Sequence, residues 1–200
     1  MNRRVFDFNE VLDRNVIAPV ARGYKALLPS IAREGVSNFF ANTQDVLSAV
    51  NLVLQKRPVD AASDLTRFLV NGTIGVFGIF DVATRLGLER HRESFSQTLG
   101  YWNVAPGPYV VWPLLGPSTL RNSVDIPIGY FTAPQNFISN QSVSNSISVI
   151  ELVHQRASLL GVGEIVDQIA LDKYLFVRDA YFQRLDAKSG QERVPDDASE

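Results

Sequence analysis

The sequence predicts an all-α protein. Apolar residues recur at helical spacing along most of the chain, and no convincing alternation of apolar and polar residues marks a sheet. The 200 residues suit one domain or a compact body with a tail, and no internal repeat is visible. We therefore expect a single helical domain over residues 1–188, followed by a polar, flexible tail over residues 189–200.

A nearly uncharged segment occupies the middle of the chain. Residues 94–150 contain two charged side chains, Arg121 and Asp125, although 20% of the whole chain is charged. Prolines interrupt the apolar and aromatic part of this segment, so it cannot form one continuous helix. Apolar backbone of this kind must be buried in protein or line a cavity at membrane depth. These prolines are Pro106, Pro108, Pro113 and Pro117.

Helices are expected throughout the first part of the chain, each with one apolar face. The first ends before Pro19, and a short second helix runs to Leu27. Proline is well placed to open a helix, so Pro29 begins a third that extends to about residue 40. Asn42 or Thr43 would cap a fourth helix ending near residue 54, and Pro58 begins a fifth that ends near residue 70.

The last part of the chain is also expected to be helical. One helix is predicted from about Ser139 to Leu160, a break at Gly161 and Gly163, and a final helix over about residues 164–185. No window reaches eighteen uninterrupted apolar residues, so the sequence contains no transmembrane helix of the usual kind.

Gly72, Gly75 and Gly78 recur at every third position among bulky apolar residues. Glycine costs a helix nearly 1 kcal/mol relative to alanine, so this spacing requires a reason. One reason is close backbone approach between helices, which is frequent in lipid-facing packing. The other is a tight turn inside a protein core. The sequence leaves both interpretations open.

Composition and motifs argue against most chemistries. A formal net charge of −2 does not favour nucleic-acid binding, and the absence of cysteine excludes disulfides and thiolate sites. The chain contains neither a G-x-S-x-G motif nor a phosphate-binding glycine loop. We expect a protein that is not an enzyme and that uses no cofactor or metal.

The two histidines are more readily explained by structure than by chemistry. His91 lies in the charged run 89–93, which is interpreted as a solvated face. Glu151 and His154 could form a metal pair on a helix, but a packing or surface histidine is favoured. Asp81 and Asp125 are isolated acids, expected to cap a helix end or to pair with Arg85 or Arg121.

Several motifs in order resemble the MlaA family, also called VacJ, of outer-membrane phospholipid-transport lipoproteins. Each motif is weak alone, but their common order and spacing over residues 2–184 is specific. They are Asn2-Arg-Arg-Val-Phe-Asp-Phe-Asn9 with Leu12-Asp13, Pro19-Val-Ala21, Gly35-Val-Ser-Asn-Phe-Phe-Ala-Asn42, Val50-Asn51, Leu54-Gln55, Arg67-Phe68 with Asn71, the stretch 75–83, Thr98-Leu-Gly100, Gly107-Pro-Tyr109, Pro113 with Gly116, and Arg178-Asp-Ala-Tyr-Phe-Gln-Arg184.

The resemblance implies a fold and a function. The expected fold is a ring or disc of amphipathic helices around a central amphipathic channel, in the inner leaflet of the outer membrane. Phospholipid misplaced in the outer leaflet would pass down this channel to a periplasmic carrier, which maintains lipid asymmetry in Gram-negative bacteria. Family members also associate with trimeric porins. They carry a leader and a lipidated cysteine ahead of the matched segment, so we expect this chain to be truncated.

The same resemblance and the residue types suggest functional positions. Asn38 and Phe39 interrupt an apolar helix face and are expected beside the channel, where packing alone is an equally good explanation. Tryptophan and tyrosine favour the interface between water and lipid. The channel-associated residues are expected to be Asn38, Phe39, Gly72, Gly75, Gly78 and Tyr109, and the membrane-interface residues Tyr101, Trp102 and Trp112, with Tyr109 on the same rim.

One departure from the family pattern affects a charge pair. The chain has Arg121-Asn122 where family members commonly have Arg-Asp, which leaves Asp125 as the nearest acid. Two other functions also fit the sequence: a scaffold that docks on a porin, and a soluble carrier of an apolar ligand. If a version with a plugged passage still restored the outer-membrane barrier, scaffolding would be favoured over transport. If the purified protein were monodisperse in plain buffer and carried no lipid, a soluble carrier would be favoured over a membrane protein.

Overall fold

A computed structural model describes the backbone of residues 1–192 and the side chains of residues 1–188. Its elements are α1 (Asn2–Leu12), a π-helical segment (Asp13–Ile17), α2 (Ala18–Leu27), α3 (Ser30–Leu54), α4 (Pro58–Thr73), α5 (Val82–Arg85), α6 (Phe95–Tyr101), β1 (Tyr109–Trp112), β2 (Gly116–Thr119), α7 (Asp125–Thr132), α8 (Gln141–Ser158), α9 (Leu160–Ile169) and α10 (Lys173–Glu192), with 3-10 turns at Asn122–Val124 and Pro134–Phe137. The predicted tail 189–200 lies outside the described residues from 193 onwards.

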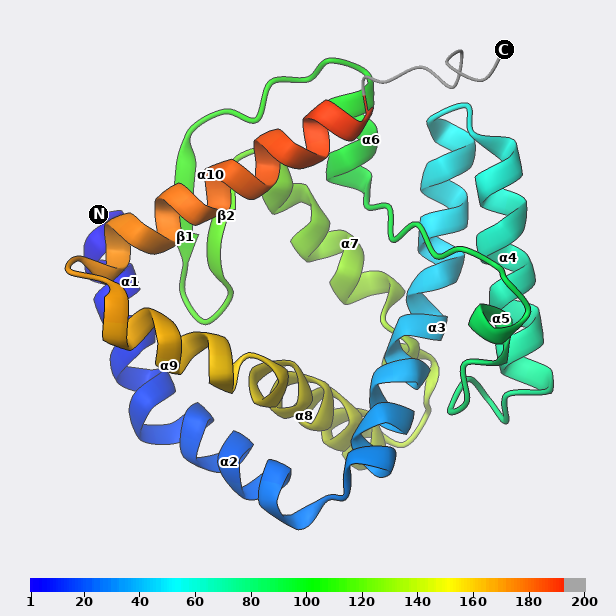
Figure 1. Cartoon of the computed structure of the whole chain (residues 1–200), viewed down its shortest axis with the longest axis horizontal. Coiled ribbons are helices and arrows are strands. Elements are labelled where there is room, and N and C mark those ends of the chain that lie inside the picture. Colours follow the sequence, from blue (N-terminus) through cyan, green and yellow to red (C-terminus); the bar gives the residue numbers. More distant parts are fainter. Residues whose placement is uncertain (193–200) are drawn as a thin grey trace.

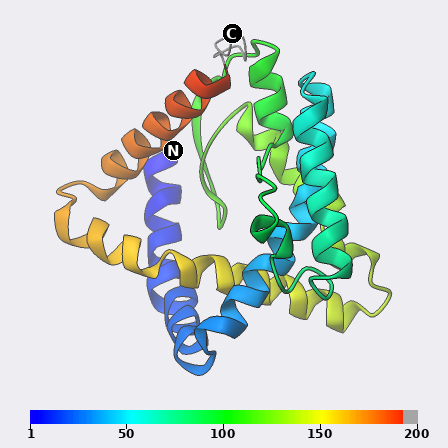
Figure 2. The same cartoon turned by 45° about the vertical axis from the view of Figure 1, so that its right-hand side comes forward.

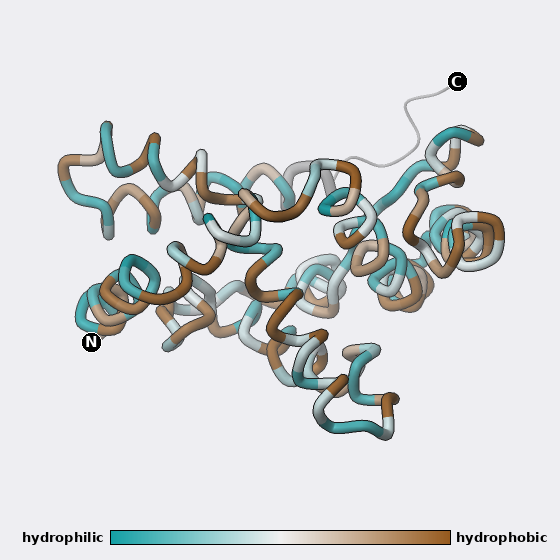
Figure 3. Tube along the Cα trace, turned by 90° about the horizontal axis from the view of Figure 1, so that it is seen from below, coloured by the Kyte–Doolittle hydropathy of each residue, from teal (hydrophilic) through white to brown (hydrophobic). Residues whose placement is uncertain are grey.

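The helices form a ring, as predicted. Viewed down the shortest axis of the molecule, α1, α2, α8, α9 and α10 enclose one side and the α3–α4 pair closes the other (Figure 1). The β1–β2 hairpin and α7 reach into the ring, and the hairpin stays inside it when the molecule is turned (Figure 2). Apolar and polar residues alternate along the helices, so most of them are amphipathic (Figure 3).

The predicted helix boundary before Pro19 is wrong, because the chain continues as a helix from α1 into α2. Proline cannot donate to the preceding turn, and its ring crowds that turn. The π-helical segment widens the turn here, and the amide of Ala18 donates to Asp13, five residues back. A wider turn accommodates Pro19 without ending the helix.

The predicted third and fourth helices are one continuous helix, α3. Asn42 and Thr43 therefore cap nothing. Asn42 is buried beneath Gly78, and the hydroxyl of Thr43 donates to the carbonyl of Phe40 at 2.8 Å within the helix. Tertiary packing outweighs the capping preference of these residues.

The antiparallel hairpin was not predicted. Its strands pair Tyr109 with Thr119 and Trp112 with Gly116, in the segment that the sequence indicates is irregular. Helix α1 covers the free edge of β1 through two amide side chains: Asn2 donates to Tyr109 O at 2.8 Å, and Asn9 donates to Trp112 O at 2.9 Å. The same side chains accept from the amides of Val111 and Leu114, so they satisfy an otherwise unpaired strand edge.

The predicted break at Gly161 and Gly163 is also misplaced. Both glycines lie inside α9, and the chain turns instead between α9 and α10 at residues 170–172. A Cβ on Gly163 would lie 3.4 Å from the guanidinium of Arg156, an ordinary van der Waals distance, so neither packing nor helix geometry breaks the chain there. Asp172 accepts from the amide of Leu175 and so caps α10.

Polar side chains fill the interior between α3 and α4. Arg67 is 0% exposed; its Nη2 donates to both oxygens of Asp81, at 2.9 and 3.0 Å, and its Nη1 donates to the carbonyl of Leu88. Arg90 pairs with buried Asp45 at 2.9 Å. We call Asp45, Asp64, Arg67, Asp81 and Arg90 the polar seam.

The pKa of Asp81 reflects the hydrogen bonds and charges of the polar seam. Burial alone would raise its pKa, but hydrogen bonds from Thr84 and Asn71 and the charge of Arg67 outweigh burial and lower the pKa to about 2. The charged run 89–93, predicted to be solvated, packs on this seam: His91 Nδ1 lies 3.0 Å from Asp64, and the amide of Glu93 donates to Ser48.

Burial is reversed relative to an ordinary soluble domain. Among the described residues, 14 buried side chains are polar or charged and 12 are apolar, six of the latter being alanine. Large apolar side chains are instead exposed on nearly every helix, as at Leu27 (85%), Val59 (80%) and Phe137 (80%). Exposed apolar surface on this scale marks contact with lipid or protein.

Two of the three glycines, Gly75 and Gly78, form a tight turn after α4, as in the second interpretation of their spacing, but this turn is not enclosed in a core. Gly72 lies in α4 with open space beside it, whereas a Cβ on Gly75 would collide with the carbonyls of Phe80 and Asn71. Gly78 has φ +83°, and a Cβ there would lie 2.8 Å from Asn42. The turn exposes Ile74, Val76 and Phe77 rather than burying them.

Substituting Arg67 should test the polar seam. Arg67→Met keeps the length of the side chain but leaves Asp45 and Asp81 without their buried partner. We expect a loss of about 3 kcal/mol in the free energy of unfolding, measured by urea denaturation in detergent and followed by circular dichroism. Arg85→Met, at an exposed cation on α5, is the control. Equal stability of the two variants would contradict the role of the seam.

Substitutions at Gly78, inside the turn, and at Gly72, before it, test the turn by comparison. Gly78→Ala should destabilise the protein by about 1–3 kcal/mol, because alanine at positive φ is strained and its Cβ meets Asn42. Gly72→Ala adds the same methyl group to a helix with open space beside it, and should be neutral or stabilising by up to about 1 kcal/mol. Thermal unfolding of both variants in one detergent measures the contrast, and a destabilising Gly72→Ala would refute it.

Candidate functional site: pockets within the ring

Two pockets lie on the inner face of α8 and adjoin each other. The first, about 410 Å³, lies between α1, the tip of the hairpin, α8, α9 and α10. The second, about 370 Å³, lies between α3, α7, the turn after α7 and α8. Leu152 and Gln155 line both pockets, so α8 carries a shared wall with one apolar and one polar side chain.

The first pocket is amphipathic. Its apolar wall includes Leu114 and Leu115 at the hairpin tip, with Leu159 and Val162 from the opposite helices. Its polar rim is held by ion pairs across the ring. Arg156 Nε lies 2.6 Å from Asp13, and Lys173 Nζ lies 2.6 Å from Asp167 and also contacts Glu10.

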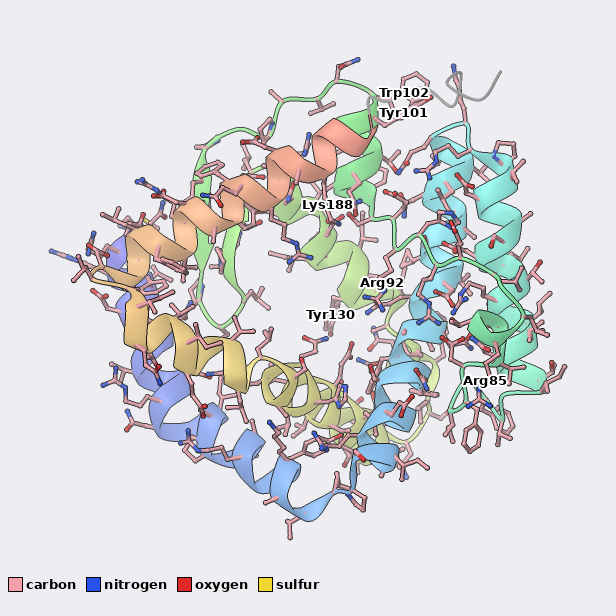
Figure 4. All side chains as sticks on the ribbon, viewed as in Figure 1. Arg85, Arg92, Tyr101, Trp102, Tyr130 and Lys188 are labelled. Atoms are coloured by element: carbon pink, nitrogen blue, oxygen red, sulfur yellow. The ribbon has the colours of Figure 1, made fainter. Side chains whose placement is uncertain are left out.

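The second pocket contains a carboxyl group at its polar side. Burial raises the pKa of Glu151, and a hydrogen bond from Gln135 at 3.2 Å partly offsets this. Tyr130, at the other side, is 68% exposed. Arg92, Tyr130 and Lys188 lie within the outline of the ring, whereas Arg85, Tyr101 and Trp102 lie at its outer side (Figure 4).

The Gly35–Phe40 motif borders a different hollow, which Phe39 lines and Asn38 does not. Phe39 is part of an apolar groove of about 540 Å³ between α3, the glycine turn and α8, whose other walls include Ile79 and Ile150. Asn38 Nδ2 donates to the carbonyl of Ile79 at 3.1 Å and so ties the turn to α3. A Cβ on Gly35 would meet the Ile79 side chain at 3.0 Å, which explains this glycine.

Gly75 and Gly78 shape the same groove, because their turn presents Ile79 and Phe80 to it. Tyr109 lies elsewhere, in an aromatic cluster with Tyr174, Tyr181 and Phe182 at centroid distances of 5.7–6.3 Å. Burial raises the pKa of Tyr109 to about 12, and its hydroxyl has no hydrogen-bond partner among the described atoms. This cluster joins β1 to α10.

The two tryptophans are exposed, and their ring nitrogens bond to protein. Trp102 is 52% exposed, donates to Leu54 O at 3.1 Å, and has the Lys56 amine 4.9 Å from its ring centroid. Trp112 is 38% exposed and donates to the hydroxyl of Ser123 at 2.7 Å. Tyr101 packs edge-to-face on Trp102.

The isolated acids occupy helix ends, as predicted. Asp81 accepts from the amide of Thr84 at the start of α5, and Asp125 accepts from the amide of Ser96 near the start of α6. Neither pairs with the arginine proposed for it. Arg121 instead donates to the carbonyl of Val104 at 2.8 Å.

His154 is a packing residue rather than half of a metal pair. Its Nδ1 lies 3.1 Å from the hydroxyl of Tyr24 on α2, and burial lowers its pKa. Residues 1–188 contain no cluster of three His, Cys, Asp or Glu side chains that could hold a metal ion. Over the same part of the chain, none of the helices has the length and apolar character needed to cross a membrane.

The pocket residues Leu152 and Gln155 were missed by the sequence prediction. They lie on α8, where an apolar and a polar side chain three positions apart share one helix face. That pattern is common to any amphipathic helix. Their significance depends on which face of α8 the ring encloses.

Comparison with known proteins places this geometry in a family. The MlaA lipoprotein family matches residues 1–188. The intermembrane phospholipid transport system lipoprotein MlaA of Escherichia coli is 36% identical over 92% of this chain and 74% of its own length, and an uncharacterised protein of Rickettsia typhi is 34% identical over 93% and 74%. A solved structure reported under "Structural basis for maintenance of bacterial outer membrane lipid asymmetry" superposes with a TM-score of 0.80 at 34% identity, covering 94% of this chain and 96% of that one. The chain therefore belongs to the MlaA lipoprotein family.

Proposed function

We propose that this protein passively moves phospholipid misplaced in the outer leaflet of the outer membrane towards a periplasmic lipid carrier. The observation that carries the proposal is the pair of adjoining pockets within the ring, one of them amphipathic, in a chain of the MlaA lipoprotein family. A phospholipid needs an apolar wall for its acyl chains and a polar track for its head group. Leu114, Leu115 and Val162 supply the first, and the ion-paired rim supplies the second.

The distribution of apolar residues supports a membrane-embedded ring at the periplasmic face of the outer membrane. Exposed apolar side chains extend over α2, α3, α4 and α9, while polar groups are buried in the seam. A soluble carrier of an apolar ligand would hide its apolar residues and present a polar exterior. The observed surface therefore favours lipid over water as the surrounding medium.

We propose two protein partners on the strength of the family resemblance: a trimeric porin beside the ring and the periplasmic lipid carrier of the same system. The apolar side chains of Val11 on α1 and Leu27 on α2 are exposed and so available for such contacts. Cross-linking from single introduced cysteines on α2 in intact cells identifies the neighbouring protein. Capture of neither a porin nor a carrier from any α2 position would count against this arrangement.

A scaffold that only docks on a porin is the second candidate, and the same exposed surface favours it. It needs no open passage. Closing the passage therefore separates the two functions, and the chain lends itself to this because it contains no cysteine.

Gln155 is the position at which to close the passage, since it lines both pockets and is exposed. Gln155→Cys, coupled to a bulky maleimide, should abolish most phospholipid movement between leaflets and an acceptor carrier in reconstituted membranes. Lys25→Cys on α2, coupled to the same reagent, should leave movement unchanged. Full transport by labelled Gln155→Cys would favour the scaffold.

We propose that Asn38 and Phe39 also affect the rate of phospholipid movement. Asn38→Ala removes the hydrogen bond that ties the glycine turn to α3, and Phe39→Ala widens the apolar groove. Both variants should change the transport rate in the reconstituted assay at normal stability. If neither changes the rate or lipid asymmetry in cells, these residues serve packing alone.

We propose that Tyr101, Trp102 and Trp112 lie at the lipid–water interface. The chain has two tryptophans, so Trp102→Phe and Trp112→Phe each leave one fluorescent reporter. Lipids brominated at shallow positions should quench both reporters more strongly than lipids brominated near the bilayer centre. Quenching by neither lipid would show that the exposed indoles do not contact the bilayer and would overturn this placement.

A further inference from the structure

A third, polar pocket lies where α6 and α10 meet the segment before α7. It is about 220 Å³, which is small beside the volumes of roughly 300–1,000 Å³ that hold whole drug-sized ligands. Its size suits one polar group rather than an acyl chain. The pocket is lined by Ser94, Ser96, Gln97, Arg121, Asn122, Asp125, Tyr181, Arg184, Leu185 and Lys188.

Positive charge predominates in this pocket. Arg121, Arg184 and Lys188 carry three positive charges against the single carboxylate of Asp125, although the whole chain has a net charge of −2. Both oxygens of Asp125 already accept hydrogen bonds, from the amide and the hydroxyl of Ser96. Both carboxylate oxygens are thus occupied by hydrogen bonds to the start of α6.

The other side-chain acceptors of the pocket are also occupied. Gln97 Oε1 accepts from the amide of Ser94 at 3.2 Å, and the Tyr181 hydroxyl oxygen accepts from Asn122 Nδ2 at 2.9 Å. Asn122 Oδ1 accepts from Arg121 Nε at 3.4 Å. The Gln97 amide nitrogen and the Tyr181 hydroxyl proton remain as donors.

The cations supply further donors. Arg184 and Lys188 lie one turn apart on α10, and neither has a hydrogen bond or ion pair with another described side chain. Lys188 lies within the outline of the ring (Figure 4). A pocket whose acceptors are used internally and whose free groups are donors and cations is suited to an anion.

We propose that this pocket binds the phosphate group of a phospholipid head group during its passage. The inference rests on the proposed function and adds the chemical group that is recognised. A phosphate diester presents two anionic oxygens that accept from arginine, lysine and neutral donors together. The adjoining ring interior would hold the acyl chains.

Paired substitutions test the site. Arg184→Gln with Lys188→Gln removes two pocket cations, and Arg22→Gln with Lys25→Gln removes two exposed cations from α2 as the charge-matched control. Binding of dihexanoyl phosphatidylglycerol to detergent-solubilised protein is measured by calorimetry. The pocket variant should bind it about tenfold more weakly, because charged hydrogen bonds are lost, while the control matches the wild type.

Dihexanoylglycerol has the same acyl chains without phosphate. It therefore distinguishes failure of the proposed phosphate site from failure of the proposed lipid-transport function. It should bind the wild type and both variants equally, since its contacts are with the apolar walls. Unchanged phosphatidylglycerol binding by the pocket variant would overturn the phosphate site and leave the proposed function standing. Binding of neither lipid to the wild type would overturn the proposed function itself.

Water-soluble phosphates show whether the pocket recognises a lipid head group or free phosphate. Inorganic phosphate and glycerophosphoglycerol should compete with the lipid only weakly, because they lack acyl chains. Competition at the same concentration as the lipid would show a site for free phosphate rather than for a head group. Circular dichroism of each variant confirms that the compared proteins are folded.

Discussion

The side of the ring that α3 and α4 form depends on neutralising the buried charge of Arg67. A guanidinium that is fully removed from solvent needs charged and hydrogen-bonding partners. Its Nη atoms donate to Leu88 O and to Asp81 at the start of α5, and its Nε lies 3.7 Å from Asp45 on α3. Asp81 thereby fixes the start of α5, and its position determines the path of the glycine turn. The groove beside Phe39 is therefore a consequence of how one buried cation is neutralised.

A polar interior and an apolar exterior are complementary solutions for a protein in lipid. Hydrocarbon offers no driving force for apolar side chains to leave the surface, so specificity must come from hydrogen bonds and charges inside. The seam provides this between α3 and α4, and pairs such as Asp13–Arg156 provide it between the ends of the chain. The walls of the first pocket are held both by such pairs and by the small apolar cluster of Ala18, Ala21, Ala157 and Leu160, which packs α2 against α8 and α9.

Periodicity was sufficient to predict the helical class and the approximate extent of α4 and α8, because their apolar faces are regular. The family resemblance, rather than the pattern, predicted the ring. Local signals failed where distant contacts decide the outcome: Pro19 is absorbed by a π turn, Asn42 is enclosed by Gly78, and the hairpin is paired along its edge by α1. Gln155 could not be recognised as a pocket residue because its position depends on ring closure.

Closure of the ring brings together residues that are far apart in the chain. Asn2 meets Tyr109 across 107 positions, Asp13 meets Arg156 across 143, and Arg3 meets Asp172 across 169. Joining such distant segments carries an entropic cost that rises slowly with their separation, and contacts of this non-local kind slow folding. The first helix made during synthesis therefore completes its contacts in two stages, first with β1 and later with the residues around Asp172 and Tyr174. A chain that ended after α9 would keep the contacts of α1 with β1 but lose those of Arg3 with Asp172 and of Phe6 with Tyr174.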